Sequence, residues 1–361
     1  MKPCPLCGGE EARVLYAARG LPLFQNKVYR AVTAARSVDT GDVTLAQCND
    51  CDFAFNASFE PEKMEYDASY QNEQCFSAVF SSYLAEVADL VMSAVGPDGA
   101  ILEIGCGKGT FFDLLKGRGV TRIKGFDPIY QGDHPDIVRA NFSAKNSTER
   151  ADLIVLRHTL EHIEFPLQFL HLIAAANDYR GKIYIEVPDF DWIVRKSAFW
   201  DVFYEHCNYF VRETLESLFT GSTWHGLFRG QHQGIVANLA DLVSKPTRQT
   251  TRRYLAFPDV GSELAGRIPA GDDVFVWGAS SKGVTLCNLV DRGCERIKGL
   301  IDINPAKQGC YTPGSGHPIF PPGHLDRASG AHPITVVVTN PNYLQEIKSQ
   351  IAHLATNVVT I

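Results

Sequence analysis

Short apolar runs alternate with amphipathic patterns over much of the chain. Between residues 76 and 187, apolar positions at three- and four-residue spacing indicate helices, whereas continuous apolar runs indicate buried strands. The patterns predict helix 76–95, strand 100–104, helix 110–116, strand 122–126, strand 153–156, helix 167–176 and strand 182–187. This alternation is typical of an α/β fold in which a parallel sheet carries helices on both faces.

A second series with the same layout follows a polar stretch. Residues 244–252 include Lys245-Pro246-Thr247-Arg248 and are typical of a linker. Beyond it, the patterns predict strand 273–277, helix 283–290, strand 297–301 and strand 335–338. The two series share a layout but not residues, so we expect two related folds rather than an internal repeat. We therefore predict three domains, 1–60, 61–245 and 246–361.

Composition and charge narrow the classes of function. The 361 residues carry a formal net charge of −7, with 45% of them hydrophobic and 21% charged, which is ordinary for a globular protein. The negative charge disfavours non-specific binding to nucleic acid or to an anionic membrane. No apolar run is long enough to predict a membrane span, and the N-terminal residues lack the apolar core of a signal peptide. We expect a cytoplasmic protein, a monomer or weak homo-oligomer, whose partner is a small molecule.

Four of the ten cysteines form two Cys-x-x-Cys pairs, Cys4 with Cys7 and Cys48 with Cys51. Two residues between thiolates let one tight turn direct both sulfurs at one metal ion, and two such turns complete a tetrahedral Cys4 zinc site. With all four positions filled by protein, the zinc would be structural. Paired thiols with a redox role are the alternative, although nothing in the sequence indicates an oxidising compartment.

A glycine-rich turn joins the predicted strand 100–104 to the next helix. Gly105, Gly107 and Gly109 let the backbone turn sharply and let a ligand approach closely. With Glu103 before them, these glycines resemble motif I of class I S-adenosylmethionine-dependent methyltransferases, which implies binding of that methyl donor. At the end of the next strand, Asp127 can accept hydrogen bonds from a ribose diol, and Pro128 follows it.

The segment that begins at Ala151 also resembles this family, at its fourth strand. Its residues Ala151-Asp-Leu-Ile-Val-Leu-Arg157-His158-Thr-Leu-Glu161-His162 would flank the donor, which implies that Arg157 and His158 bind it. His158 and His162 are also spaced to hold a metal ion together, but no acidic third ligand is evident in the sequence. Capping or core hydrogen bonds are the other interpretation.

Two further segments extend the resemblance to nearly the whole chain. They are Tyr204-Glu205-His206-Cys-Asn-Tyr209-Phe210 and Gly278-Ala-Ser-Ser-Lys282-Gly283-Val-Thr285, the second followed by Asp302-Ile-Asn304-Pro305-Ala-Lys307-Gln308-Gly309. With the cysteine pairs, this order resembles the sugar C-methyltransferases of deoxysugar biosynthesis. The resemblance implies a zinc-binding N-terminal module, a class I methyltransferase domain with a Rossmann-like sheet, and a second, C-terminal Rossmann-like domain.

The chemistry of that family assigns expected roles near His206. Methyl transfer to a carbon beside a ketone requires a base to form an enolate and a hydrogen-bond donor for its oxygen. The resemblance implies His206 as base, with Glu205 orienting its ring, binding a substrate hydroxyl or assisting the proton transfer. Capping a helix or anchoring a loop is the alternative for this pair. Phe203 stands where the family commonly has a tyrosine, so Tyr204 is a candidate instead, as are Tyr66 and Tyr70.

The C-terminal glycine loop predicts an anion site. It follows a strand and opens a helix, so its backbone amides can cradle a phosphate. Ser280, Ser281, Lys282, Asn304 and Lys307 would add donors, and a nucleotide diphosphate or another anionic acceptor group would be the ligand. The alternative is a degenerate Rossmann domain kept for packing.

These patterns together predict a methyltransferase that acts on a small molecule. We expect C-methylation next to the ketone of a nucleotide-linked keto-deoxysugar, with S-adenosylmethionine as donor and structural zinc. An O- or N-methyltransferase of another metabolite with the same architecture is the second hypothesis. A non-catalytic protein that binds a nucleotide or sugar is the third, although a base beside a methyl-donor site argues against it.

Overall fold

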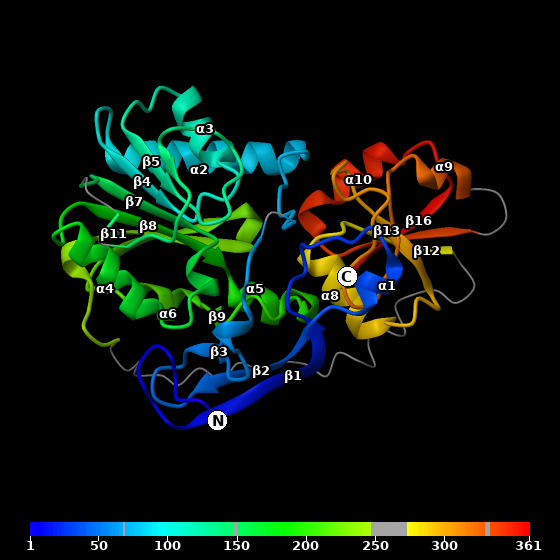
Figure 1. The fold of residues 1–361 in the computed structure, drawn as a ribbon, viewed down its shortest axis with the longest axis horizontal. Helices are drawn as coiled ribbons and strands as arrows, with labels where there is room; N and C mark the ends of the chain where they lie inside the picture. Colours follow the sequence, from blue (N-terminus) through cyan, green and yellow to red (C-terminus); the bar gives the residue numbers. More distant parts are fainter. Residues whose placement is uncertain (68, 144, 147–149, 247–272, 329–332) are drawn as a thin grey trace.

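The computed structural model contains three β-sheets, one for each part of the chain. It describes residues 1–361 except 68, 144, 147–149, 247–272 and 329–332, so most of the predicted linker lies outside the described residues. The central and C-terminal parts form two lobes, and the N-terminal sheet runs beneath both (Figure 1).

The central lobe has a seven-stranded sheet. Its order is β10 (Ser222–Leu227), β11 (His232–Asn238), β8 (Lys182–Pro188), β7 (Leu153–Arg157), β4 (Ile101–Ile104), β5 (Ile123–Phe126) and β6 (Ile137–Val138). The strands from β8 to β6 are parallel, whereas β10 and β11 are antiparallel to their neighbours. The helices are α2 (Ala78–Val95), α3 (Thr110–Gly117), α4 (Pro166–Ala176), α5 (Phe190–Arg195) and α6 (Arg212–Glu216). The predicted elements of the first series are confirmed to within two residues at each end.

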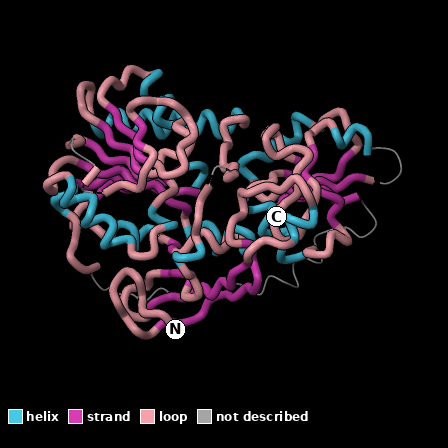
Figure 2. Tube along the Cα trace, viewed as in Figure 1, coloured by secondary structure: helices cyan, strands magenta, loops and turns pink. Residues whose placement is uncertain are grey.

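The C-terminal lobe has a five-stranded sheet in which every pair of neighbours is parallel. Its strands lie apart from those of the central lobe (Figure 2). Its order is β14 (Ile319–Phe320), β13 (Ile297–Ile301), β12 (Asp273–Trp277), β15 (Ile334–Val338) and β16 (Thr356–Thr360). The helices are α8 (Ser281–Val290), α9 (His324–Ala328) and α10 (Leu344–Gln350). The second predicted series is therefore confirmed, and α8 starts two residues earlier than expected.

The N-terminal sheet combines strands from two parts of the chain. Its order is β1 (Ala12–Pro22), β2 (Thr40–Cys48), β3 (Ala54–Asn56) and β9 (Asn208–Tyr209), and α1 (Val32–Arg36) lies between β1 and β2. Because β9 begins at Asn208, far beyond residue 60, the sheet crosses the predicted domain boundary at residue 60. The three-domain division thus stays a prediction.

One hydrophobic core connects all three parts. It contains Leu21 and Val43 from the N-terminal sheet, Trp200 from the central lobe, and Val276 and Leu286 from the C-terminal lobe. The Trp200 indole also donates a hydrogen bond of 3.0 Å to the carbonyl of Thr339. The lobes are therefore fixed against one another by buried apolar surface.

The helix α2 has the length and mean hydropathy of a membrane-spanning helix. Six of its side chains are buried, among them Phe80, Leu84 and Val87, and they belong to the core of the seven-stranded sheet. Polar Glu86 and Asp89 lie between them in the sequence. These features are those of a core helix that buries one face.

Candidate active site

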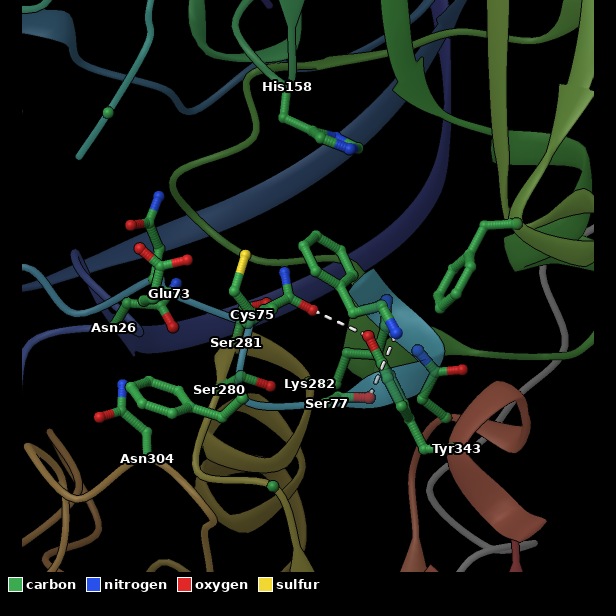
Figure 3. A pocket seen from close by; sticks show the side chains of 18 of the residues that line it. Asn26, Glu73, Cys75, Ser77, His158, Ser280, Ser281, Lys282, Asn304 and Tyr343 are labelled. Atoms are coloured by element: carbon green, nitrogen blue, oxygen red, sulfur yellow. Dashed lines mark hydrogen bonds between the residues drawn. The ribbon is translucent and has the colours of Figure 1, made fainter. Parts of the chain in front are cut away.

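A cavity of about 340 Å³ lies between the two lobes. Its wall is built from the loop after β4, the end of β7, residues 201–206, the loops after β12 and β13, and the segment 70–77. Figure 3 shows that His158 and Ser280 reach it from different lobes. The parallel strands β4, β7, β12 and β13 therefore end at one common space, as expected for ligand sites in open α/β sheets.

The glycine-rich turn has the backbone geometry that the sequence predicts. Gly105 and Gly107 have φ of +79° and +57°, and Gly109 precedes α3 with φ of +83°. A Cβ atom on Gly105 would lie 2.2 Å from the hydroxyl of Thr159, whereas one on Gly107 would meet nothing within 4 Å. Gly105 is thus needed for packing. Gly105 and Gly107 both line the cavity, while Gly109 does not.

Glu103 has a buried oxygen without a partner among the described residues. The side chain is 2% exposed, lines the cavity, and leaves Oε2 without a hydrogen bond. Burial raises the pKa of Glu103 to about 7, an effect that the charge of Arg157 opposes. An unpaired buried carboxylate is costly, so this position fits a ligand that brings positive charge.

Asp127 supports the turn from the end of β5. Its Oδ2 accepts from the Gly107 N–H at 2.8 Å, and its Oδ1 accepts from the Ile129 N–H at 2.9 Å. Burial raises the pKa of Asp127, and these two backbone bonds oppose the rise. Asp127 and the exposed Pro128 are not among the residues that line the cavity, so contact between Asp127 and a ribose stays a prediction.

Arg157 and His158 lie in the cavity wall, as the sequence predicts, but both are held by the fully buried Glu186. Arg157 donates to both carboxylate oxygens at 2.8 and 3.0 Å, His158 Nε2 lies 2.8 Å from the same carboxylate, and the Tyr83 and Tyr184 hydroxyls also donate to it. Although burial disfavours the charged imidazole, Glu186 raises the pKa of His158 to about 9. This part of the wall is a closed network of paired charges.

Two sets of three side chains bring metal-ligating atoms within 4.8 Å of one another. They are His158, Glu186 and His232, and Glu161, His162 and His206. His158 and His162 fall in different sets, so the structure does not unite them as the metal pair that their spacing allows. In the second set, His162 Nδ1 lies 2.9 Å from the carbonyl oxygen of Glu205, and Glu161 Oε2 is buried without a hydrogen bond from any described residue.

His206 lies in the cavity wall with its ring 8% exposed. It packs against the Phe203 ring at a centroid distance of 4.1 Å and the His162 ring at 4.8 Å. Burial, followed by the charges of His162 and Lys282, lowers the pKa of His206 well below its usual value. In the described part of the chain no group hydrogen-bonds its imidazole. The ring is therefore neutral at pH 7 and can accept a proton from a ligand.

Glu205 does not orient the His206 ring, which corrects the sequence-based expectation. Its Oε1 accepts from the Gln25 N–H at 2.7 Å, and its Oε2 accepts from the Tyr70 and Tyr66 hydroxyls at 2.6 and 3.4 Å. The carboxylate is fully buried, and burial raises its pKa. Consecutive side chains diverge here, so Glu205 fixes the tyrosines instead of its neighbour.

Two of the three candidate tyrosines, Tyr70 and Tyr204, lie in different places. Tyr70 lines the cavity, although its proton is directed to Glu205. Tyr204 is outside the cavity: its hydroxyl accepts from the Glu60 N–H at 3.0 Å, and its ring fills the space beside Gly41. This position contradicts a catalytic role for Tyr204, which packs the N-terminal sheet instead.

The C-terminal loop brings its predicted residues to the cavity. Ser280, Ser281 and Lys282 line it at the start of α8, where the Ser280 side chain makes no capping hydrogen bond. Lys282 is not a free cation, because it forms an ion pair with the buried Asp201 of the central lobe. Gly283 is required here, because a Cβ atom would lie 2.0 Å from the carbonyl oxygen of Gly278.

Asn304 and Lys307 line the cavity from the turn after β13 and are 3% and 2% exposed. The Asn304 side chain accepts from the Ala306 N–H at 2.9 Å, and the Lys307 ammonium donates to the Ala279 carbonyl at 2.8 Å. Burial lowers the pKa of Lys307, and the charge of Asp302 opposes this. No carboxylate of a described residue forms an ion pair with Lys307, so this part of the wall suits an anion.

The four N-terminal cysteines converge next to β2. All four sulfurs lie within 4.8 Å of one another, with Cys4 Sγ 3.7 Å from Cys51 Sγ and Cys7 Sγ 3.6 Å from Cys48 Sγ. A tetrahedral site with Zn–S bonds of about 2.3 Å has sulfurs about 3.8 Å apart. The donor set and its spacing therefore fit zinc.

Asn26 and Glu161 line the cavity, although the sequence assigned neither of them a role of its own. Asn26 comes from the N-terminal part and hydrogen-bonds Tyr70, and Glu161 presents the buried unpartnered oxygen described above. Asn26 lies in a loop that matches no motif, so the sequence around it gives no indication that it lines the cavity. Glu161 lies beside His162, and the shared segment was a usable signal for it.

Two family models match parts of the chain. Residues 79–222 match the model of a methyltransferase domain, and residues 259–360 match that of a C-methyltransferase C-terminal domain. The chain is 24% identical over 310 residues to the C-methyltransferase NovU of Streptomyces niveus, which covers 73% of this chain and 72% of that protein.

Solved structures also align with part of the chain. A SAM-dependent methyltransferase from Archaeoglobus fulgidus aligns at 16% identity and a TM-score of 0.34, over 42% of this chain and 93% of that one. The PH0226 protein from Pyrococcus horikoshii aligns at 14% identity and a TM-score of 0.37, over 45% and 92% of the two chains.

Proposed function

We propose that this chain, an S-adenosylmethionine-dependent methyltransferase with a C-methyltransferase C-terminal domain, methylates a carbon beside the ketone of a nucleotide-linked keto-deoxysugar. One observation carries the proposal. The donor-type glycine turn, His206 and the lysine-bearing C-terminal loop all line a single cavity. The similarity to the C-methyltransferase NovU supports carbon as the methylated atom.

The central lobe holds the methyl donor in this proposal. When bound, S-adenosylmethionine supplies an electrophilic methyl group on a positively charged sulfur. Glu103, with its unpartnered Oε2, balances positive charge at the glycine turn. Gly107 leaves open space for the ligand, and Asp127 holds the turn through the Gly107 N–H. These residues bind and orient, and none of them needs to move a proton.

His206 acts as the base on the acceptor molecule. The neutral imidazole would remove the proton from the carbon beside the ketone. The enolate carbon would then bond to the methyl group as the methyl–sulfur bond breaks, and S-adenosylhomocysteine would leave with that electron pair. Because burial lowers its pKa, the imidazole of His206 is unprotonated at neutral pH and its ring nitrogen is available for this proton. Glu205 has no contact with this ring and holds Tyr70 in the wall. Glu205 and Tyr70 are thus positioning residues.

The C-terminal loop binds the anionic end of the acceptor. The backbone amides at the start of α8, the Ser280 and Ser281 hydroxyls and the Lys307 ammonium form its donors. A nucleotide diphosphate provides the negative charge that this wall lacks. Lys282 contributes less, since Asp201 already pairs with it.

The direct test uses S-adenosylmethionine labelled with 13C on the methyl group and a panel of nucleotide-linked keto sugars, with products examined by NMR. We expect a labelled methyl on the carbon next to the ketone. Label on oxygen or nitrogen would refute the enolate route and would indicate an O- or N-methyltransferase instead. No product from any keto sugar, despite donor binding, would refute the sugar as acceptor.

We also propose that Cys4, Cys7, Cys48 and Cys51 bind one structural zinc ion. The spacing of their sulfurs and the four-thiolate donor set support it. Two of the ligands flank the sheet: Cys48 ends β2, and Cys51 precedes β3. Zinc would therefore hold the turn between β2 and β3, next to the edge of the sheet where β9 pairs with β3.

Replacing Cys4 with serine should release the metal and lower the melting temperature, because structural zinc contributes directly to folding. Metal content by mass spectrometry and thermal unfolding would measure both. Cys310→Ser is the control, because Cys310 lies in the C-terminal lobe and should keep one zinc per chain. A purified wild-type protein that is fully folded without zinc would refute the site.

A further inference from the structure

The N-terminal part of the chain contributes one buried polar group to the cavity. Asn26 is 7% exposed and lines the cavity, and its Oδ1 has no hydrogen bond from any described residue. It lies between β1 and α1, next to Gln25, whose N–H holds Glu205. We propose that Asn26 determines acceptor specificity by accepting a hydrogen bond from a hydroxyl or N–H group of the acceptor molecule.

The hydrogen-bond directions around Tyr70 fix how Asn26 is oriented. Glu205 accepts from Gln25, Tyr66 and Tyr70, as expected of an ionised carboxylate. The proton of Tyr70 is therefore directed to Glu205, and its oxygen can only accept. Asn26 consequently directs its Nδ2 donor to Tyr70, at 3.2 Å, and leaves Oδ1 as the free acceptor.

Asn26 is fixed in this position from its backbone outwards. Its carbonyl oxygen accepts from the Gln71 N–H at 2.8 Å, and Lys27 forms a β-bridge with Tyr70. The Lys27 ammonium also pairs with Asp67 at 2.7 Å. These contacts fix the backbone at Asn26, and the side chain itself is held by its hydrogen bond to Tyr70. A buried amide oxygen held this way is preorganised for a ligand.

The acceptor, rather than the methyl donor, is the ligand that reaches Asn26. Asn26 hydrogen-bonds Tyr70, and Tyr70 hydrogen-bonds Glu205. Glu205 directly precedes His206, the proposed base. Asn26 and Lys307 line the same cavity, so this wall and the anion site face one space. In Figure 3, Asn26 lies on the side of Ser280 and Asn304, with His158 across the cavity.

A methyl-acceptor molecule without a hydroxyl or N–H group at this point should bind and react poorly, because it would leave Oδ1 of Asn26 buried and unpaired. Leaving such a group unsatisfied costs between about 5- and 150-fold in an equilibrium or rate constant. Sites built to hydrogen-bond a substrate hydroxyl discriminate strongly against the analogue that lacks it. The inference rests on the proposed function for the identity of the acceptor, but the contact itself is defined by the cavity.

The experiment compares nucleotide-linked 4-keto sugars that lack one hydroxyl at a time. In the wild type, removing one particular hydroxyl should lower kcat/KM by between about 5- and 150-fold. In Asn26→Leu, the same removal should change kcat/KM less than about 3-fold, since leucine has no acceptor to leave unpaired. Asn72→Leu is the matched control: Asn72 is also an amide in the cavity wall but is exposed, so discrimination should persist.

Binding of the same sugars, measured by calorimetry with S-adenosylhomocysteine present, separates this inference from the proposed function. Suppose that binding depends on one hydroxyl in the wild type but not in Asn26→Leu, and that no C-methylated product forms. This result would refute the proposed function and support the specificity role of Asn26. Equal discrimination by Asn26→Leu and the wild type, or no discrimination by the wild type, would overturn the role of Asn26. Asn26→Ala repeats the test if the leucine variant does not fold.

Discussion

Each lobe has a glycine-rich turn of the same layout, but the buried side chain beside the turn is acidic in one lobe and basic in the other. In each, a strand runs into a glycine turn and a helix, and an aspartate at the end of the next strand accepts a backbone N–H of the turn. Asp127 accepts from Gly107 at 2.8 Å, and Asp302 accepts from Ala279 at 2.7 Å. Yet the central turn has the unpartnered Glu103 oxygen beneath it, whereas the C-terminal turn has the Lys307 ammonium.

The difference indicates that the backbone defines a ligand site and that one or two side chains choose the charge of the ligand. Oriented N–H groups at a helix start favour anions. In the central lobe the buried Glu103 opposes that preference, which suits a cationic methyl donor. In the C-terminal lobe Lys307 reinforces it, which suits a phosphate.

The largest effect should come from a residue that belongs to neither turn. His206→Ala removes the proposed base between them, and loss of a general base typically costs 10²- to 10⁴-fold in rate. Calorimetry should show unchanged donor affinity, because His206 makes no contact within the glycine turn. The wild-type kcat at saturating donor should stay level as pH falls from about 8 to 6.5, since the pKa of His206 lies well below 6.5.

A variant that turns over at the wild-type rate would remove His206 as the base. A variant that also loses the donor would mean that the ring serves the central turn, and the chemistry would then have to be reassigned. His171→Ala is the matched control: this histidine lies on α4 and hydrogen-bonds the Val243 carbonyl, outside the cavity.

Glu103→Gln should break the charge difference between the turns. Replacing the carboxylate by a neutral amide removes a charged partner worth about 1.5–3 kcal/mol, so donor affinity should fall on the order of 10- to 100-fold. Because the pKa of Glu103 is about 7, wild-type affinity for the donor should weaken as pH falls below 7, where the carboxyl becomes neutral. Calorimetry at several pH values measures this, and the variant should lack the pH dependence that Glu103 contributes.

The two aspartates offer a matched pair. Asp127→Ala should weaken the methyl donor by about 1–3 kcal/mol, because it removes the support of the Gly107 N–H and the expected ribose contact. Asp302→Ala removes the equivalent support from the C-terminal turn and should leave donor affinity unchanged. Equal donor affinity in both variants would show that the two turns do not divide the ligands as proposed.

Lys307→Met should have the smallest effect of the set, about 10-fold in acceptor affinity and none in donor affinity. Methionine fills a similar volume and removes the buried ammonium that the anionic end would meet. Binding of a nucleoside diphosphate, measured by calorimetry, is the readout. Lys298→Met is the control, because Lys298 is exposed on β13 and outside the cavity. Unchanged binding in Lys307→Met would refute the anion site.

The sequence predicted the parts of the site that depend on local backbone geometry. Gly105 and Gly107 form a turn after a buried strand whatever surrounds them, and Asp127 meets this turn because neighbouring parallel strands end at one edge. The converging cysteines likewise follow from two tight turns. Such features are set within a few residues or between adjacent strands, so a motif carries them.

The remaining features depend on contacts between distant segments. Tyr204 and Glu205 adjoin His206 in the sequence, but each side chain of this irregular segment faces a different neighbour, so proximity misassigned their roles. Lys282 forms an ion pair with Asp201 of the other lobe, and Asn26 lies in the cavity wall, where it hydrogen-bonds Tyr70. No periodicity or spacing encodes such pairings.

The two-residue strand β9 connects the N-terminal sheet to the segment that carries His206, the proposed base. Ala54 pairs with Tyr209 and Phe55 with Asn208, two residues beyond His206. A slip of one residue in this pairing would exchange the faces to which these side chains point. Exchanging the N-terminal module with that of a relative would replace one side of this pairing next to the proposed base. Chimeric enzymes should retain activity only when residues 54–56 and 208–209 are exchanged together.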